Sequence, residues 1–204
     1  MSVYDAEYFF LRLPKGDERL PFLVPDEATA DRRFRRIRQA PGTPPLVFHN
    51  GWRDEVKRRG VRTVVPDVMF SGADMVISAH IKEELARFRP SHVAPHPSVY
   101  IDDNDVRHDG YWFLTFSEEL DCWDRATSCF EQDVDPVRVG GATLHQVYEY
   151  RLDGAVLDRI PLEQRLLFKM GGTLTGMIVC HISILKIFTT SAGAELDVVA
   201  ITDY

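Results

Sequence analysis

Short hydrophobic runs separated by polar turns are the main feature of this chain. The runs are rich in Val, Ile, Leu, Tyr and Phe, which is typical of β-strands. They predict strands at residues 8–13, 44–50, 61–70, 75–78, 96–101, 111–116, 144–152, 155–160, 165–170, 177–180 and 194–201. Asp153 and Gly154 separate two of these runs, and such a pair between strands predicts a hairpin turn.

Apolar side chains at helical spacing predict helices at residues 26–40, 51–60, 78–89 and 181–188. Gly60 is a typical C-terminal residue for the second helix. Ser78 is a candidate N-cap for the third helix, and Pro90 would end it.

The first predicted helix carries a run of arginines. Ala30, Phe34 and Ile37 would share one face, so the basic side chains would occupy the others, namely Arg32, Arg33, Arg35, Arg36 and Arg38. We interpret them as a solvated helix face. A nucleic-acid site would need aromatic side chains among the basic ones, and this segment has none on that face.

Together these elements predict an α+β fold, with a mixed or antiparallel sheet and helices packed on it. Residues 75–101 and 177–201 follow the same strand–helix–strand order. At an offset of 102 residues, Val76-Ile77-Ser78 lies opposite Ile178-Val179-Cys180 and Leu85 lies opposite Ile187. This similarity favours a duplicated unit.

Length and composition agree with a folded, soluble protein. The 204 residues and 45% hydrophobic content suit one domain or two small lobes. Residues 170–194 contain a single charge, Lys186, but also several glycines, so we interpret them as a buried strand and helix and not as a membrane span. The acidic N-terminus lacks the features of a secretory signal, and we therefore expect a cytoplasmic protein.

Charge is distributed unevenly along the chain. Residues 1–62 have a net charge of +4 and residues 63–204 a net charge of −11. Acidic residues are densest at 102–135, where aromatic residues lie among them. Two interpretations remain open: a solvated loop and edge strand, or a docking surface for a basic protein. The candidate partner-binding residues are Asp102, Asp103, Asp105, Asp109, Trp112, Glu118, Glu119, Asp121, Trp123 and Asp124.

No motif predicts catalysis, cofactor binding or metal binding. His92 and His96 have a spacing found in zinc sites, but the prolines around them prevent the helix that would bring them together. Cys122, Cys129 and Cys180 form no CxxC pair, so we expect reduced thiols that binding does not require. Phosphate loops, nucleophile elbows and HExxH motifs are absent from the sequence.

The C-terminal two-thirds of the chain carries a recognisable pattern. A hydrophobic strand at 111–116 is followed by Asp121, Asp124 and Ser128; Phe168 lies in a later strand, and Gly193 precedes the last one. This pattern, with the earlier Met75–Ser78 segment, resembles bacterial polymorphic-toxin immunity proteins, most closely families eleven and forty-three. The resemblance covers residues 67–204 and departs at Cys180, where those families usually have Ser. Residues 1–66 match no known pattern and are expected to be an N-terminal part packed on an immunity-protein-like domain.

The resemblance implies a cytoplasmic antidote that binds a cognate toxin domain and neutralises it by occlusion. Two alternatives remain: a small hydrolase with an unrecognised His and carboxylate site, and a non-catalytic scaffold domain. A toxin-encoding gene beside this one would favour the first interpretation.

Overall fold

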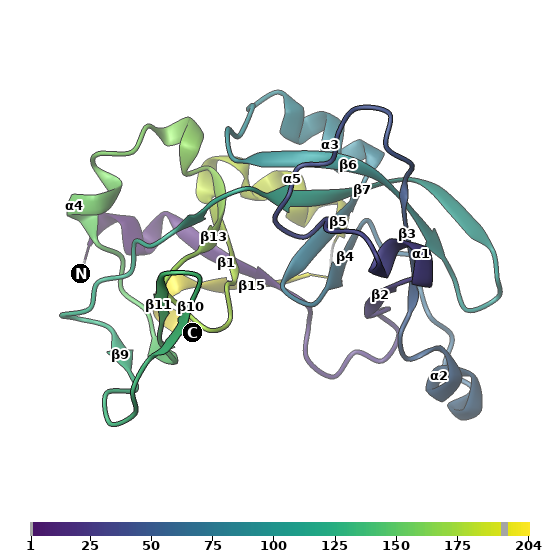
Figure 1. Cartoon of the computed structure of the whole chain (residues 1–204), viewed down its shortest axis with the longest axis horizontal. Helices are drawn as coiled ribbons and strands as arrows, with labels where there is room; N and C mark the ends of the chain where they lie inside the picture. Colours follow the sequence, from purple (N-terminus) through teal and green to yellow (C-terminus); the bar gives the residue numbers. More distant parts are fainter. Residues whose placement is uncertain (1, 193–195) are drawn as a thin grey trace.

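Two mixed β-sheets form the framework of the protein (Figure 1). The structure is a computed structural model that describes residues 2–192 and 196–204. The six-stranded sheet has the order β2-β3-β6-β7-β5-β4. Its strands are β2 (Leu23–Pro25), β3 (Leu46–Asn50), β4 (Val68–Ser71), β5 (Asp74–Ser78), β6 (Val93–Ile101) and β7 (Arg107–Phe116). Only β3 and β6 run parallel among the neighbouring strands of this sheet.

The five-stranded sheet has the order β15-β1-β14-β13-β8. Its strands are β1 (Tyr8–Arg12), β8 (Glu119–Leu120), β13 (Leu167–Met170), β14 (Ile178–His181) and β15 (Asp197–Ala200). Two small antiparallel pairs lie beside it: β9 (Cys129–Phe130) with β12 (Val147–Glu149), and β10 (Val137–Val139) with β11 (Ala142–Leu144).

The helices are short. They are α1 (Glu27–Ala30), α2 (Arg53–Arg59), α3 (Ala79–Ala86), α4 (Gly154–Leu157) and α5 (Ile182–Ala192), with 3₁₀ turns at Val3–Ala6, Leu162–Gln164 and Ile201–Asp203. The predicted α+β class with mixed sheets is therefore confirmed. Gly60 ends α2 in a left-handed conformation, as the sequence predicts. Ser78 occupies the predicted N-cap position of α3, but its hydroxyl makes no capping hydrogen bond.

Each sheet contains one strand–helix–strand segment with an antiparallel strand between its two strands. In β5-α3-β6 that strand is β7, and in β14-α5-β15 it is β1. The helices α3 and α5 pack on each other. Their first residues, Ala79 and Ile182, are 103 positions apart. The helix starts therefore differ by one residue from the offset of 102 in the sequence comparison.

The shared core lies where the two helices meet the sheets. Ile81 and Leu85 of α3 are buried against Ile184 and Phe188 of α5, together with side chains of both sheets. Removing these apolar surfaces from water is the main contribution to folding here. Gly193, part of the predicted pattern before the last strand, lies outside the described residues.

The first 66 residues belong to both sheets. Strand β1 lies between β14 and β15 of the five-stranded sheet, whereas β2 and β3 extend the edge of the six-stranded sheet. A boundary at residue 66 therefore separates no structural unit, because strand pairing on both sides crosses it.

The predicted helix at 26–40 is wrong beyond its first turn. Asp26 caps α1 by accepting a hydrogen bond from the Thr29 amide at 2.8 Å, but the helix ends at Ala30. Phe34 is buried between the rings of Phe48 and Phe113. An α-helix could not place Phe34 in this core while its neighbour Arg35 reaches into the β4–β5 turn, so tertiary contacts outweigh helix propensity.

The predicted hairpin at Asp153-Gly154 is also wrong. The Asp153 carboxylate accepts hydrogen bonds from the amides of Ala155 at 2.9 Å and Val156 at 3.2 Å, and it therefore caps α4. Residues 155–160 are not a strand. Leu157 packs into the core beneath the five-stranded sheet, which a single helical turn achieves.

A buried carboxylate joins the parts of the fold. Asp74, at the start of β5, bonds to Lys169 of β13 in the other sheet and to Arg35, whose Nη1 lies 2.6 Å from it. Arg35 also donates to the carbonyl of Ser71 at 2.8 Å. Asp74 and Lys169 are both buried, so each charge depends on the other to offset its loss of hydration.

We predict that Asp74→Asn lowers the free energy of unfolding by about 3 kcal/mol, because it leaves the buried Lys169 ammonium without a counter-charge. The matched control is Asp121→Asn, which breaks the exposed pair with Arg125 and should cost about 1 kcal/mol or less. Urea unfolding measures both. Adding Lys169→Met to Asp74→Asn should recover part of the loss. Equal stabilities of the Asp74 and Asp121 variants would contradict the role of this charge.

Candidate functional site

Four of the candidate acidic residues lie at the tip of the β6–β7 hairpin, and two of them are buried. Asp102 accepts hydrogen bonds from the amides of Asn104 at 2.8 Å and Val106 at 2.9 Å, and it contacts the His108 ring at 3.0 Å. Burial opposes ionisation of Asp102, but the bonds from His108 and the two amides outweigh it and lower the pKa of Asp102. This side chain therefore closes the turn.

Asp103 is likewise part of the interior. It accepts a hydrogen bond from the Asn50 amide at 3.2 Å and another from the Thr63 hydroxyl. Asp105 and Asp109 are exposed, and each pairs with an arginine of this chain, Arg53 and Arg107 respectively. Of the four residues, only these last two can reach a partner.

The remaining candidates are Trp112, in the middle of β7, and residues that follow the end of this strand. Trp112 is half-buried, and the Lys82 ammonium lies 4.4 Å from the centre of its ring. Trp123 is only 1% exposed and packs edge-on against Phe130, so the prediction that it contacts a partner is wrong. The other acids are engaged within the chain: Glu118 with His92, Glu119 with Arg36, Asp121 with Arg125, and Asp124 with Thr127.

These two groups do not form one surface. The tip acids and the acids from Glu118 onward lie at opposite ends of β7, and ten residues of strand span about 33 Å. The aromatic residues Tyr111, Phe113 and Phe116 of β7 are buried in the core and do not line a docking surface. The predicted continuous acidic face at 102–124 is therefore divided, because most of its side chains are used to close turns or to fill the core.

A different surface combines acids with exposed apolar side chains. Strands β10 and β11 pair only with each other within the described part of the chain, and Val137 lies opposite Leu144 and Val139 opposite Ala142. This side of the hairpin is apolar, yet Val137 is 46% and Val139 60% exposed. We call residues 131–144 the hairpin face.

The hairpin face is also acidic. Val134, 58% exposed, lies between Asp133 and Asp135, and the hairpin face contains three carboxylates and one arginine, a net charge of −2. Gly140 and Gly141 both have positive φ angles and form the turn. Two glycines between short alternating segments are the sequence signal that could have revealed this hairpin.

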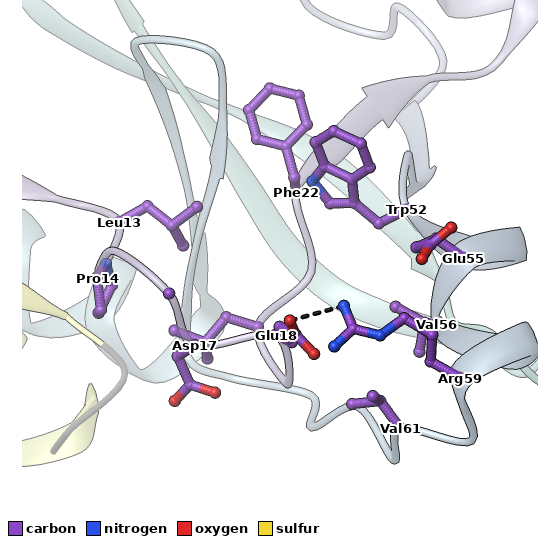
Figure 2. Close-up of a pocket in the computed structure, with 12 residues that line it drawn as sticks. Leu13, Pro14, Asp17, Glu18, Phe22, Trp52, Glu55, Val56, Arg59 and Val61 are labelled. Carbon is purple, nitrogen blue, oxygen red and sulfur yellow. Dashed lines mark hydrogen bonds and ion pairs between the residues drawn. The ribbon is translucent and has the colours of Figure 1, made fainter.

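A pocket lies beside α2 (Figure 2). It is a pocket of about 350 Å³, lined by apolar side chains of the β1–β2 connection and α2 and by the exposed ring of Trp52. Phe22 lies next to Trp52, with the ring centres 6.4 Å apart. An ion pair between Glu18 and Arg59, 2.7 Å, forms one edge of the pocket.

His181 comes nearest to a hydrolytic arrangement. Its Nδ1 lies 2.8 Å from the Ser183 hydroxyl and 3.2 Å from the Ser183 amide, and its Nε2 lies 3.7 Å from a Glu7 oxygen. Burial lowers the pKa of His181. Because Nδ1 accepts from the backbone at the first turn of α5, the geometry is that of a helix cap.

Metal-ligating side chains do not gather elsewhere in the described residues. No group of three or more His, Cys, Asp or Glu side chains with the geometry for a metal ion is found among them. His96 is buried in β6, and its Nε2 lies 3.0 Å from the carbonyl of Pro44, whereas His92 contacts Glu118.

Comparison with models of known protein families and with curated proteins gave no match. Among the described residues, the helices are too short or too polar to cross a membrane.

The cysteines differ in accessibility, and this gives a prediction. Burial raises the pKa of Cys122 and of Cys180, whereas Cys129 is exposed at the start of β9. A disulfide reagent reacts with the thiolate form of cysteine, which burial suppresses. It should therefore react with one thiol per native chain and with all three thiols after denaturation. Cys129→Ser should remove the reaction of the native protein. Rapid reaction of Cys122 or Cys180 in the folded state would contradict this burial.

Proposed function

We propose that this chain is an immunity protein that binds a cognate bacterial toxin domain in the cytoplasm and neutralises it by occlusion, without catalysis. The hairpin face is the proposed docking surface. The observation that carries the proposal is an apolar hairpin side left open to solvent and flanked by carboxylates.

Several properties of the hairpin face favour a protein as its ligand. Contiguous exposed apolar side chains are uncommon on a monomer and often mark a protein-binding site. Val137 and Val139 project from the same side of β10, where they could fit an apolar surface of a partner. The outer strand edges carry backbone groups that a partner strand could use.

The charge of this region favours a basic partner. The hairpin face has a net charge of −2, which would attract a cationic surface and accelerate encounter. The resemblance of residues 67–204 to immunity-protein families supplies the biological class, namely a toxin made by the same or a neighbouring cell. Occlusion is proposed because the exposed features of the face are those of a contact surface.

We also propose that β5-α3-β6 and β14-α5-β15 are copies of one unit. Two observations support this proposal. Each unit has an antiparallel strand between its own two strands, and α3 packs on α5. The intervening strand follows the unit in one case and comes from the N-terminus in the other. Under this proposal the N-terminal segment is part of the second unit.

Replacing Val137 and Val139 together with Ser should weaken toxin binding at least tenfold, or about 1.4 kcal/mol, because it removes apolar contact area. The partner to use is the toxin encoded beside this gene. Growth rescue on co-expression and calorimetry with a catalytically inactive toxin measure the effect. The matched control is Val65→Ser with Val106→Ser, two exposed valines outside the hairpin face. If the wild-type chain is produced and growth stays arrested, the proposed function is wrong.

Charge reversal separates the two ends of the acidic segment. Asp133→Lys with Asp135→Lys should slow association with the toxin, and added salt should slow the wild type, since the Debye length falls from about 10 Å at 0.1 M to about 3 Å at 1 M. Asp105→Lys with Asp109→Lys is the control with the same change of charge at the β6–β7 tip. Stopped-flow kinetics compare them. A larger effect at the tip would place the docking surface there.

A further inference from the structure

A cavity of about 540 Å³ lies beside the β10–β11 hairpin. Its walls come from the hairpin itself, from the segment that follows β7 and from the turn that follows β13. We call it the hairpin cavity. Gly141, Ala142 and Thr143 line it and also belong to the hairpin face. The cavity and the hairpin face are therefore continuous, and a partner that covers one also reaches the other.

The base of the hairpin is anchored to the turn that follows β13. The amide of His145 donates to the carbonyl of Gly172, and the amide of Leu174 donates to the carbonyl of His145, both at 3.0 Å. The His145 ring packs edge-on against Trp123 and Phe130, with ring centres 5.6 and 5.2 Å away. These contacts form the cavity without a partner, so a side chain that enters it does not have to order the walls.

The charged side chains of the lining favour a cation. Glu119 and Asp121 supply two carboxylates and Arg125 supplies one guanidinium, a net charge of −1 with His145 neutral. Arg125 is held to Trp123: its Nη1 donates to the Trp123 carbonyl at 3.0 Å, and its guanidinium lies 4.0 Å from the centre of the Trp123 ring. The negative charge of the lining adds to that of the hairpin face.

Both carboxylates keep the capacity to bind a further donor. Glu119 contacts Arg36 through Oε1 at 2.7 Å, and Asp121 contacts Arg125 through Oδ2 at 2.6 Å. The second oxygen of each carboxylate has no such contact within the described part of the chain. Arg36 is 75% exposed and is not part of the lining. Exposed pairs of this kind contribute little, so a donor from a partner can join or replace them at small cost.

We propose that the hairpin cavity receives a cationic side chain of the toxin, an arginine or a lysine, while Val137 and Val139 contact the apolar surface around it. The aliphatic part of this side chain would lie along Ala142, and its charged end would reach Glu119 and Asp121. This inference rests on the proposed function and names the chemistry that the toxin surface must present. A cation enclosed at the centre of a contact is a typical anchor of a protein interface.

Removing both carboxylates without changing their shape tests the inference. Glu119→Gln with Asp121→Asn should make dissociation of the toxin about tenfold faster or more, because the enclosed cation loses its counter-charges. The matched control is Asp105→Asn with Asp109→Asn, which removes two exposed carboxylates at the β6–β7 tip and should change dissociation by less than about twofold. Stopped-flow kinetics compare the variants, and urea unfolding checks that they remain folded.

The outcomes separate this inference from the proposed function. Growth that stays arrested with the wild-type chain refutes the proposed function. Wild-type rescue with equal dissociation rates for the two double variants refutes the cavity contact alone. Single Arg→Ala and Lys→Ala variants of the toxin then locate the cation: one of them should weaken binding to the wild type but not to the Glu119→Gln with Asp121→Asn variant.

Blocked amino acids test the cavity without the toxin. N-acetylarginine amide and N-acetyllysine amide should shift the NMR signals of the Ala142, Thr143 and Gly172 backbone amides in the wild type, and the neutral N-acetylnorleucine amide should not. Glu119→Gln with Asp121→Asn should remove the response to both cationic probes, since it removes the carboxylates that recognise them. An equal response to all three probes, or no response to the cationic pair, would overturn the inference.

Discussion

The buried carboxylate of Asp74 is the constraint on which the arrangement of the two sheets depends. It lies in the six-stranded sheet and pairs with Lys169 of the five-stranded sheet and with Arg35 of the N-terminal segment. A buried charge without partners is strongly unfavourable, so Asp74 favours the arrangement in which both cationic segments lie beside it. The pair with Arg35 is also one of the tertiary contacts of the arginine-rich segment beyond the helix that ends at Ala30.

The hairpin face and the pocket beside α2 lie toward opposite ends of the long axis (Figure 1). The hairpin face joins exposed valines to carboxylates, and such a combination lets charge guide the approach of a partner while apolar contacts hold it. The pocket beside α2 has a mixed lining, in which Asp17, Glu18 and Glu55 lie beside Arg59. The charge of the hairpin face therefore supports the proposed binding of a basic toxin.

Acid density along a sequence proved a weak guide to a binding surface. A carboxylate next to a turn can accept hydrogen bonds from nearby amides, as Asp102 and Asp153 do, and it then becomes a structural group. Asp103 is engaged in the same way by Asn50 and Thr63, which are distant in sequence. Asp133 and Asp135 are exposed beside the exposed Val134, and it is this exposure, not acid density, that marks them as candidates for contact with a partner.

The sequence by itself determined the α+β class, most strands and the end of α2, because runs of β-prone apolar residues and Gly60 act through local backbone preferences. It could not determine which strands pair, since the partner of β1 lies some 170 residues away. Phe34, Arg35 and Trp123 were misjudged for the same reason: their environment is made by distant segments. The apolar side of the β10–β11 hairpin and the pocket beside α2 were decided by the tertiary structure alone, because exposure is a property of how the whole chain packs.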